Sequence, residues 1–224
     1  MSIGFRILPR QRKVDTSVVE RFSQLPVANV SDCMSRMTAG GASLKPIHKA
    51  ALLAGPAFTV KTRPGDNLMI HKALDLAEPG DIVVVDGGGD LTNALIGELM
   101  VAHAEARGLG GIVIYGAIRD YATLSIGSFP VFACGVTHRG PYKDGPGEIN
   151  VPIAIDGMVI EPGDLMLGDH DGLLCVPYDH VEPIYKATRA KYDGEQTSMA
   201  EIKAGKQNRS WIDATLKRLN CEGI

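Results

Sequence analysis

Three charged residues in one short stretch have types and a spacing that suit oxyanion chemistry. Glu98 opens an expected helix, and Arg119 and Asp120 follow an expected strand. Mg²⁺ usually takes one or two carboxylates and keeps several waters, and a guanidinium binds a carboxylate or enolate oxygen in a bidentate manner. These groups predict a divalent-metal site that holds an oxyanion. The same residue types also occur as a plain Arg–Asp ion pair and as a glutamate that serves the helix dipole.

The elements around these residues must bring them together. The stretch Asn93–Asp120 predicts a helix, a glycine turn at Gly108–Gly111 and a buried strand at Ile112–Tyr115. The helical period is set by Leu95, Leu99, Ala102 and Ala106. If the strand runs parallel to its neighbours, the helix start and the strand end meet at one sheet edge, where open α/β sheets place ligands. Backbone N–H groups around Gly97–Met100 offer a place for a second anionic oxygen.

The composition fits a soluble globular protein of one large domain or two small ones. The chain has 224 residues, of which 45% are hydrophobic. Its net charge of −3 gives no argument for nucleic-acid binding, and no apolar run approaches the roughly 18 residues needed to span a membrane. The N-terminus lacks the core of a signal peptide, so we expect a cytoplasmic protein. The four scattered cysteines favour free thiols over disulfides or zinc.

The rest of the chain predicts alternating strands and helices, and hence the α/β fold class. We expect one domain over residues 1–224, with an irregular basic arm at 1–15 and a helical tail at 179–224 whose long helix packs on a neighbouring subunit. The expected helices are Ser17–Leu25, Ala28–Met37, Asn67–Ala77, Tyr121–Ile126, a long helix to Lys203, and Ser210–Leu219. The expected strands are Ala51–Thr62, Ile82–Val85, Pro130–Cys134 and Leu165–Leu167, with a hairpin around Asp156-Gly157.

Several other polar residues have a structural explanation that we prefer to a ligand role. Asp66 can cap the helix that follows it, and His71 on that helix is expected to be satisfied or solvated rather than to face a pocket. The loop His138–Pro146 has three groups that could bind an anion, but we prefer a solvated loop; they are His138, Arg139 and Lys143. Residues 168–172 are expected to form a tight turn, because their spacing is not that of a calcium loop. The chain has neither a P-loop lysine nor a GxGxxG fingerprint, which disfavours nucleotide binding.

Three motifs together resemble the RraA-like family, which includes the 4-hydroxy-4-methyl-2-oxoglutarate (HMG) and 4-carboxy-4-hydroxy-2-oxoadipate aldolases. They are GELM at 97–100, VIYGAIRD at 113–120 and VIEPGDLMLGDHDGLLCVP at 159–177. The resemblance covers most of the chain, from Ala28 to Gly205. It implies a swivelling β/β/α-type fold with C-terminal helices, a homotrimer or a hexamer of two trimers, and a divalent cation, Mg²⁺ or Mn²⁺, at subunit interfaces.

The resemblance also implies a role for each candidate residue. Arg119 would bind the substrate and steady the pyruvate enolate, and Asp120 would be the direct protein ligand of the metal. Glu98 stands where the family aldolases carry an aspartate and would hold metal-bound water. Glu195 in the tail helix would reach into the neighbouring subunit's site. The backbone amides that would take the substrate carboxylate are those of Gly97, Glu98, Leu99 and Met100.

Two departures from the family pattern bear on the substrate. Glu98 is one methylene longer than aspartate, and Thr123 occupies a position where the family aldolases carry an acid. A regulatory branch of the family has a glycine at the position of Glu98 and binds a ribonuclease instead, so the carboxylate here favours catalysis.

We therefore expect a metal-dependent aldolase that cleaves a 4-hydroxy-2-oxo acid such as HMG to pyruvate. A metal-polarised water would take the C4 hydroxyl proton, and oxaloacetate would lose CO₂ through the same enolate. The alternative is a non-catalytic regulator that binds a ribonuclease.

Overall fold

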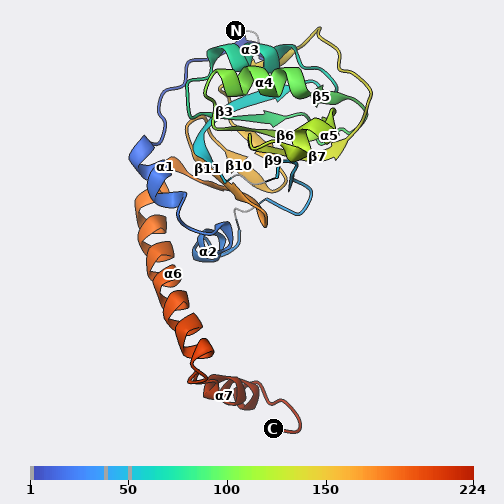
Figure 1. Ribbon diagram of the computed structural model, residues 1–224. Coiled ribbons are helices and arrows are strands. Elements are labelled where there is room, and N and C mark those ends of the chain that lie inside the picture. Colours follow the sequence, from blue (N-terminus) through green and yellow to red (C-terminus); the bar gives the residue numbers. More distant parts are fainter. Residues whose placement is uncertain (1–2, 38–39, 50–51) are drawn as a thin grey trace. The chain divides into compact units, whose positions relative to one another are not determined.

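The computed structural model describes residues 3–37, 40–49 and 52–224 (Figure 1). The chain divides into two compact units, Met1–Thr188 and Arg189–Ile224. The first unit contains the β-strands and the candidate site. The second contains the end of the long tail helix and the helix after it.

The main sheet is mostly parallel at its centre. Among the described residues its strands follow the order β1–β8–β3–β4–β6–β7–β2. Neighbours from β3 to β7 are parallel, whereas β8 runs antiparallel to β3, and β2 antiparallel to β7. The bounds are β1 (Phe5–Ile7), β2 (Lys45–Pro46), β3 (Leu53–Thr62), β4 (Ile82–Asp86), β6 (Gly111–Ile118), β7 (Val131–Val136) and β8 (Gly147–Ile149).

A second β layer shares a strand with the main sheet. The first half of β3 pairs antiparallel with β11, and β11 pairs antiparallel with β12. A separate hairpin joins β9 to β10. The bounds are β9 (Ile153–Ile155), β10 (Met158–Ile160), β11 (Leu165–Asp169) and β12 (Gly172–Val176). A buried apolar cluster lies between the two β layers and includes Val113, Phe132 and Ile155.

Helices α3, α4 and α5 cover the opposite face of the main sheet. Figure 1 shows α3 and α4 on one side of it and β9, β10 and β11 on the other. The bounds are α3 (Leu68–Leu76), α4 (Glu98–Ala106) and α5 (Tyr121–Ile126). A second buried cluster joins these helices to the sheet through residues such as Ile70, Val101 and Ile114. Of the two earlier helices, α1 (Thr16–Phe22) contacts β3, and α2 (Val27–Cys33) contacts β11 and β12. The layer order is β/β/α, which confirms the expected fold class.

The predicted apolar face of α4 is wrong. Leu95 lies in a separate short strand, β5 (Ala94–Ile96), which pairs parallel with β6. The helix begins only at Glu98, and its buried residues are Met100, Val101 and Ala104. Leu99 is 78% exposed. The predicted period counted a strand residue as the first position of the helix, and this error rotated the expected face toward solvent.

Other boundaries differ in smaller ways. The predicted irregular arm contains β1, and α1 and α2 end before the predicted Leu25 and Met37. Strand β6 is longer than the predicted Ile112–Tyr115. Of the predicted strand Ala51–Thr62, Ala51 lies outside the described residues. The hairpin turn is confirmed, because Asp156 and Gly157 both have positive φ, at 46° and 88°. The turn between β11 and β12 is likewise confirmed.

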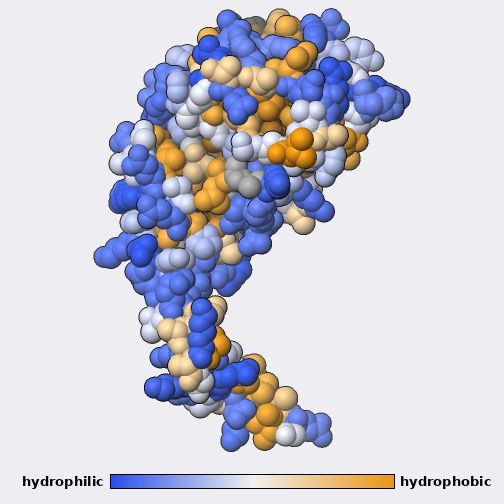
Figure 2. Space-filling model, in the orientation of Figure 1, coloured by the Kyte–Doolittle hydropathy of each residue, from blue (hydrophilic) through white to orange (hydrophobic). Residues whose placement is uncertain are grey.

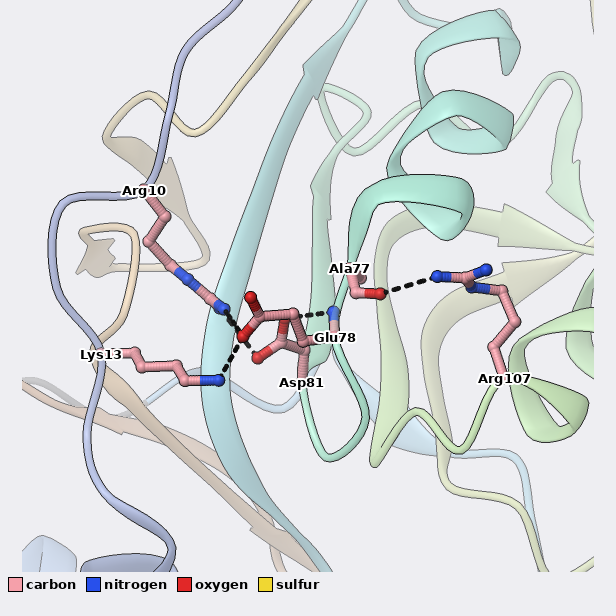
Figure 3. A network of polar contacts seen from close by, with 6 residues as sticks. All are labelled: Arg10, Lys13, Ala77, Glu78, Asp81 and Arg107. Carbon is pink, nitrogen blue, oxygen red and sulfur yellow. Dashed lines mark hydrogen bonds and ion pairs between the residues drawn. The ribbon is translucent and has the colours of Figure 1, made fainter.

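The basic arm is held by ion pairs to a turn of the main sheet. Arg10 donates to the buried carboxylate of Asp81 at 2.8 Å and to Glu78 at 3.3 Å, and Lys13 also pairs with Glu78. Asp81 in turn accepts from the Glu78 N–H at 2.8 Å. Figure 3 shows Arg10 and Lys13 reaching from the arm toward this turn. Arg12 makes a matching pair with Asp179 at 2.9 Å. The arm is therefore fixed to the body of the first unit.

The arm contacts predict a pH dependence of stability. The Lys13 ammonium holds the pKa of Glu78 below its ordinary value. The unfolded chain thus binds a proton at Glu78 before the folded chain does, and the stability from this pair is lost as the pH falls through the folded pKa. Glu78 is 60% exposed, so solvent limits the contribution to less than about 1 kcal/mol. Glu78→Gln should flatten the decline of urea stability between about pH 5 and pH 3. An unchanged slope would contradict this assignment.

The chain ends in two helices. A one-turn 3₁₀ helix (Tyr178–His180) leads into α6 (Val181–Lys203), and α7 follows at Ser210–Arg218. Within the second unit α7 has no buried residue, and Trp211 and Leu219 are exposed. Figure 2 shows apolar side chains at the surface of this segment. In the described part of the chain, no helix is both long and apolar enough to cross a membrane.

Candidate active site

The start of α4 meets Arg119 and Asp120 at the carboxyl edge of the parallel strands. Strand β6 ends at Ile118, and Arg119 and Asp120 follow it directly. Strand β5 lies beside β6 with Ile96 opposite Ile118, so Gly97 and the start of α4 face the same edge. The Arg119 N–H donates to the Ile96 carbonyl at 3.0 Å. This confirms that the helix start and the strand end meet, as parallel pairing required.

Asp120 is oriented back toward α4. Its φ of 58° and ψ of 35° place it in the left-handed region, which aspartate tolerates better than most residues. Its carbonyl accepts from the N–H groups of Thr123 and Leu124, both at 3.1 Å, so Asp120 also starts α5. Its carboxylate Oδ2 accepts from the Glu98 N–H at 2.9 Å. The left-handed conformation therefore lets Asp120 cap α5 with its backbone and direct its carboxylate toward the start of α4.

Arg119 and Asp120 also contact each other. Arg119 Nε lies 3.7 Å from Asp120 Oδ2, and the two side chains are 45% and 36% exposed. Both interactions of the carboxylate use Oδ2. Among the described residues, Oδ1 accepts no hydrogen bond. The site thus presents one carboxylate oxygen and most of a guanidinium to an incoming ligand.

Gly97 leaves the space that this arrangement needs. A Cβ at this position would lie 2.3 Å from Asp120 Oδ2 and about 3 Å from the Arg119 side chain, at 3.0 Å from Cγ and 3.1 Å from Nε. Gly97 has an extended backbone, with φ −152° and ψ −169°, so the requirement comes from space and not from backbone strain. The Glu98 N–H can approach the carboxylate only because residue 97 has no side chain.

Two surface depressions include Arg119 in their lining. One is lined by Arg119 together with Gly97, Leu99 and Met100 of the α4 start, and by several residues that sequence reasoning did not select; these are Asn67, His71, Pro141 and Lys143. The other is lined by Arg119, Asp120, Val136, Thr137 and His138. His71, His138 and Lys143 are all exposed, as the preferred solvated roles predicted. Each of them also borders a depression that includes Arg119.

The environment of His71 favours its neutral form. Partial burial lowers the pKa of its imidazole below the ordinary value, and the nearby Lys143 ammonium lowers this pKa further, while Asp75 opposes the shift.

The loop that carries Lys143 crosses the site because another segment fixes it. We call residues 138–146 the strap. The Asp66 carboxylate is fully buried and accepts from the N–H groups of Asp144 at 2.7 Å and Gly145 at 2.8 Å. It also accepts from the Leu68 N–H at 2.9 Å, so the predicted contact with the helix start is confirmed. The sequence analysis did not predict that Asp66 fixes the strap. No sequence motif marks this contact, because the groups that donate to Asp66 are backbone N–H groups 78 and 79 positions later.

Glu98 lines neither of the two depressions that include Arg119. It lines a third depression, between α4 and α5, together with Thr123. The contact of Glu98 with Asp120 is made by its backbone N–H. Glu195 belongs to the second unit, where it pairs with Lys191 at 2.7 Å. The predicted roles of Glu98 and Glu195 near a metal stay predictions.

The donor set fits a hard divalent cation that keeps most of its water. Within residues 3–37, 40–49 and 52–224, no cluster of three His, Cys, Asp or Glu side chains has metal-binding geometry. Such a cluster would suit zinc, whereas Mg²⁺ and Mn²⁺ accept one or two carboxylates plus water. Asp120 Oδ1 has no hydrogen-bond partner among the described residues, and its side chain is 36% exposed, which suits Mg²⁺ or Mn²⁺.

A comparison with protein families decides the relationship. The family described as "RraA-like: Aldolase/RraA" matches residues 27–175, more than half of the chain. The chain belongs to the RraA-like family. The matched range contains the α4 start, Arg119 and Asp120, and the strap, whereas the tail helices lie outside it.

Individual relatives agree with this placement. A Halalkalibacterium halodurans protein, named provisionally as an HMG aldolase, is 36% identical over 189 residues, which are 84% of this chain and 90% of that protein. A crystal structure of an uncharacterised Pseudomonas syringae protein matches with a TM-score of 0.78 at 26% identity, covering 87% of this chain and 96% of the other. A structure described as the RNA-processing inhibitor RraA from Thermus matches with a TM-score of 0.63 at 32% identity, covering 68% and 92%. RraA-like relatives thus include both named aldolases and a named inhibitor.

Proposed function

We propose that this protein is a divalent-metal-dependent lyase that cleaves a 4-hydroxy-2-oxo acid, such as HMG, and releases pyruvate. Oxaloacetate decarboxylation would be a side activity. The observation that supports this most is the placement of Arg119 and Asp120 against the start of α4, where Asp120 Oδ1 accepts no hydrogen bond from the described part of the chain. The aldolase names of relatives such as the H. halodurans protein support the same reaction class.

Arg119 binds the 2-oxo acid end of the substrate in this proposal. Its guanidinium holds the keto oxygen and one carboxylate oxygen in a bidentate manner. When the C3–C4 bond breaks, its electron pair forms the pyruvate enolate, and C4 becomes a carbonyl after its hydroxyl proton leaves to water near Glu98. The negative charge then develops on the keto oxygen, beside the fixed guanidinium. A proton delivered to C3 completes pyruvate.

The start of α4 receives the substrate carboxylate. Two of the four predicted amides already have partners, because Glu98 donates to Asp120 and Met100 donates to the Gly97 carbonyl at 3.1 Å. The amides of Gly97 and Leu99 are therefore the ones that we expect to bind the carboxylate, with the helix dipole in support.

Asp120 would hold the Mg²⁺ or Mn²⁺ directly, and Glu98 would hold it through water. Glu195 of a second copy would complete the site in a homotrimer or hexamer. When bound, the cation would supply Lewis-acid stabilisation of the charge on the keto oxygen. The remaining groups bind and orient the substrate.

Metal removal tests the proposal. Pyruvate release from HMG and from oxaloacetate should fall at least about 100-fold in EDTA and return when Mg²⁺ or Mn²⁺ is added in excess. A coupled lactate dehydrogenase assay measures the product. Turnover on oxaloacetate alone would keep the lyase class and point to another aldol substrate, as the Glu98 and Thr123 departures suggest. Turnover that survives EDTA would contradict the metal-dependent route.

The second candidate is a regulator that binds a ribonuclease. The structural match to the Thermus protein described as an RNA-processing inhibitor favours it. This function predicts no turnover on either substrate and a ribonuclease affinity that neither EDTA nor Arg119→Ala changes. Measuring turnover and ribonuclease binding on the same preparation separates the two candidates.

A further inference from the structure

The strap covers the candidate site without contributing a predicted catalytic group. Pro141 and Lys143 line one of the two depressions that include Arg119, and His138 lines the other. One nine-residue segment thus borders both depressions. The position of the strap sets the shape and charge of the space that a 2-oxo acid would occupy.

The side chains of Asp66 and Asn93 both bind the backbone of the strap. At its far end, the Asp66 carboxylate accepts the Asp144 and Gly145 N–H groups on a single oxygen, Oδ2. At its near end, the Asn93 side-chain amide donates to the Gly140 carbonyl at 2.5 Å. Backbone bonds run alongside, from Tyr142 N–H to the Gly65 carbonyl at 2.8 Å and from Ala94 N–H to the Arg139 carbonyl at 2.8 Å.

Asp66 holds the strap more strongly than Asn93 does, because its hydrogen bonds are made by a buried, charged carboxylate. A fully buried carboxylate is stable only when hydrogen bonds replace its water, and here three backbone N–H groups and Arg63, at 3.2 Å, do so. The carboxylate has no contact with Arg119, Asp120 or the start of α4 in the structure. Its influence on the site therefore passes through the strap.

We infer that Asp66 is a positioning residue for substrate binding, which acts by holding the strap, and with it Lys143, against the Arg119 depression. This inference rests on the proposed function for its kinetic consequence. A loosened strap widens the pocket and withdraws a positive charge from an anionic substrate, while Arg119 and Asp120 keep their own contacts. The effect should appear in KM more than in kcat.

Asp66→Asn tests the inference with little change in volume. The asparagine side chain has only one oxygen that can accept hydrogen bonds. Its NH₂ group must therefore face either the strap amides or the Leu68 N–H, and neither of these can accept a hydrogen bond from it. We expect KM to rise at least about tenfold with kcat within about threefold. Hydrogen exchange at the Asp144 and Gly145 amides should also become faster.

Asp164→Asn is the matched control. Asp164 is also buried and accepts two backbone N–H groups, from Glu161 at 2.9 Å and from Tyr178 at 2.8 Å, but it does not contact the strap. It should lose comparable stability and keep its KM. The same KM rise in both variants, or none in Asp66→Asn, would overturn the inference.

A second variant guards against a failure to fold. Asn93→Ala removes only the fastening at Gly140, and it should raise KM about three- to fivefold. If Asp66→Asn does not fold, an unchanged KM in Asn93→Ala overturns the inference.

If the wild type turns over neither substrate, the proposed lyase function fails. The strap is then tested by the affinity for oxalate, a mimic of the pyruvate enolate. Asp66→Asn should weaken oxalate binding at least about tenfold, and Asp164→Asn should not. Equal oxalate affinities in the three proteins would overturn the inference about the strap.

Discussion

Arg119→Ala is expected to lower kcat/KM for pyruvate release at least about 1,000-fold. Removing one preorganised donor from a developing oxyanion typically costs about 100- to 1,000-fold, and the guanidinium donates twice and carries the charge. The fold should survive, because the side chain is 45% exposed and the backbone contact to Ile96 stays in place. Steady-state kinetics on HMG and oxaloacetate, with circular dichroism as the folding check, measure the effect.

Two further arginine variants sharpen this prediction. Arg119→Lys keeps the charge but loses the bidentate geometry, so it should recover only part of the activity. Arg139→Ala removes another exposed arginine from the neighbouring strap, and Arg139 does not line either depression beside Arg119. It should stay within about threefold of wild type. Equal losses in Arg119→Ala and Arg139→Ala would show a general charge effect and refute the specific role of Arg119.

Gly97→Ala is expected to lower activity at least about 100-fold although it adds a single methyl group. The new Cβ would lie 2.3 Å from Asp120 Oδ2, which forces the carboxylate to turn away and breaks its bond from the Glu98 N–H. A shift of about 1 Å in a catalytic group can cost this much. Because the displaced carboxylate is partly exposed, the chain should still fold. Mn²⁺ affinity measured by calorimetry should weaken at least about tenfold, in line with the activity.

Gly127→Ala provides the comparison for that variant. Gly127 follows α5, and the nearest atom to an added Cβ is the Leu124 carbonyl oxygen at 3.4 Å, an ordinary contact. This variant should keep both activity and metal affinity. If Gly97→Ala were as active as Gly127→Ala, the close approach of α4 to Asp120 would not matter for function.

The meeting of the α4 start with Arg119 and Asp120 could be predicted from sequence, because it depends on elements that follow one another along the chain. Glu98 lies in a helix start, and Arg119 and Asp120 lie at a strand end, so the topology of one helix and one strand suffices to join them. The hairpin turn at Asp156-Gly157 was readable for the same reason, since two neighbouring residues carry the whole signal.

The fixed position of the strap could not be predicted from sequence, because the contacts that hold it join residues far apart along the chain. Asp66 has the sequence context of a helix cap, and it does contact the Leu68 N–H, but the same carboxylate also binds backbone amides about 80 positions later. Backbone amides have no residue type, so no motif records them. The misplaced face of α4 has a different origin, because a three-residue strand directly before a helix can extend the apparent helical period by one turn.

The pairing of β1 also has a consequence for how the chain folds. Phe5 lies opposite Gly147, and the Arg6 side chain binds Glu148, 142 positions later. During synthesis, the first strand must therefore wait until most of the first unit has left the ribosome before its partner exists. Contacts of such long range form slowly because a large loop must close first. We expect β1 and the arm to be the last parts of the first unit to gain protection in refolding. Until then the edge of β8 remains open to pairing with another chain.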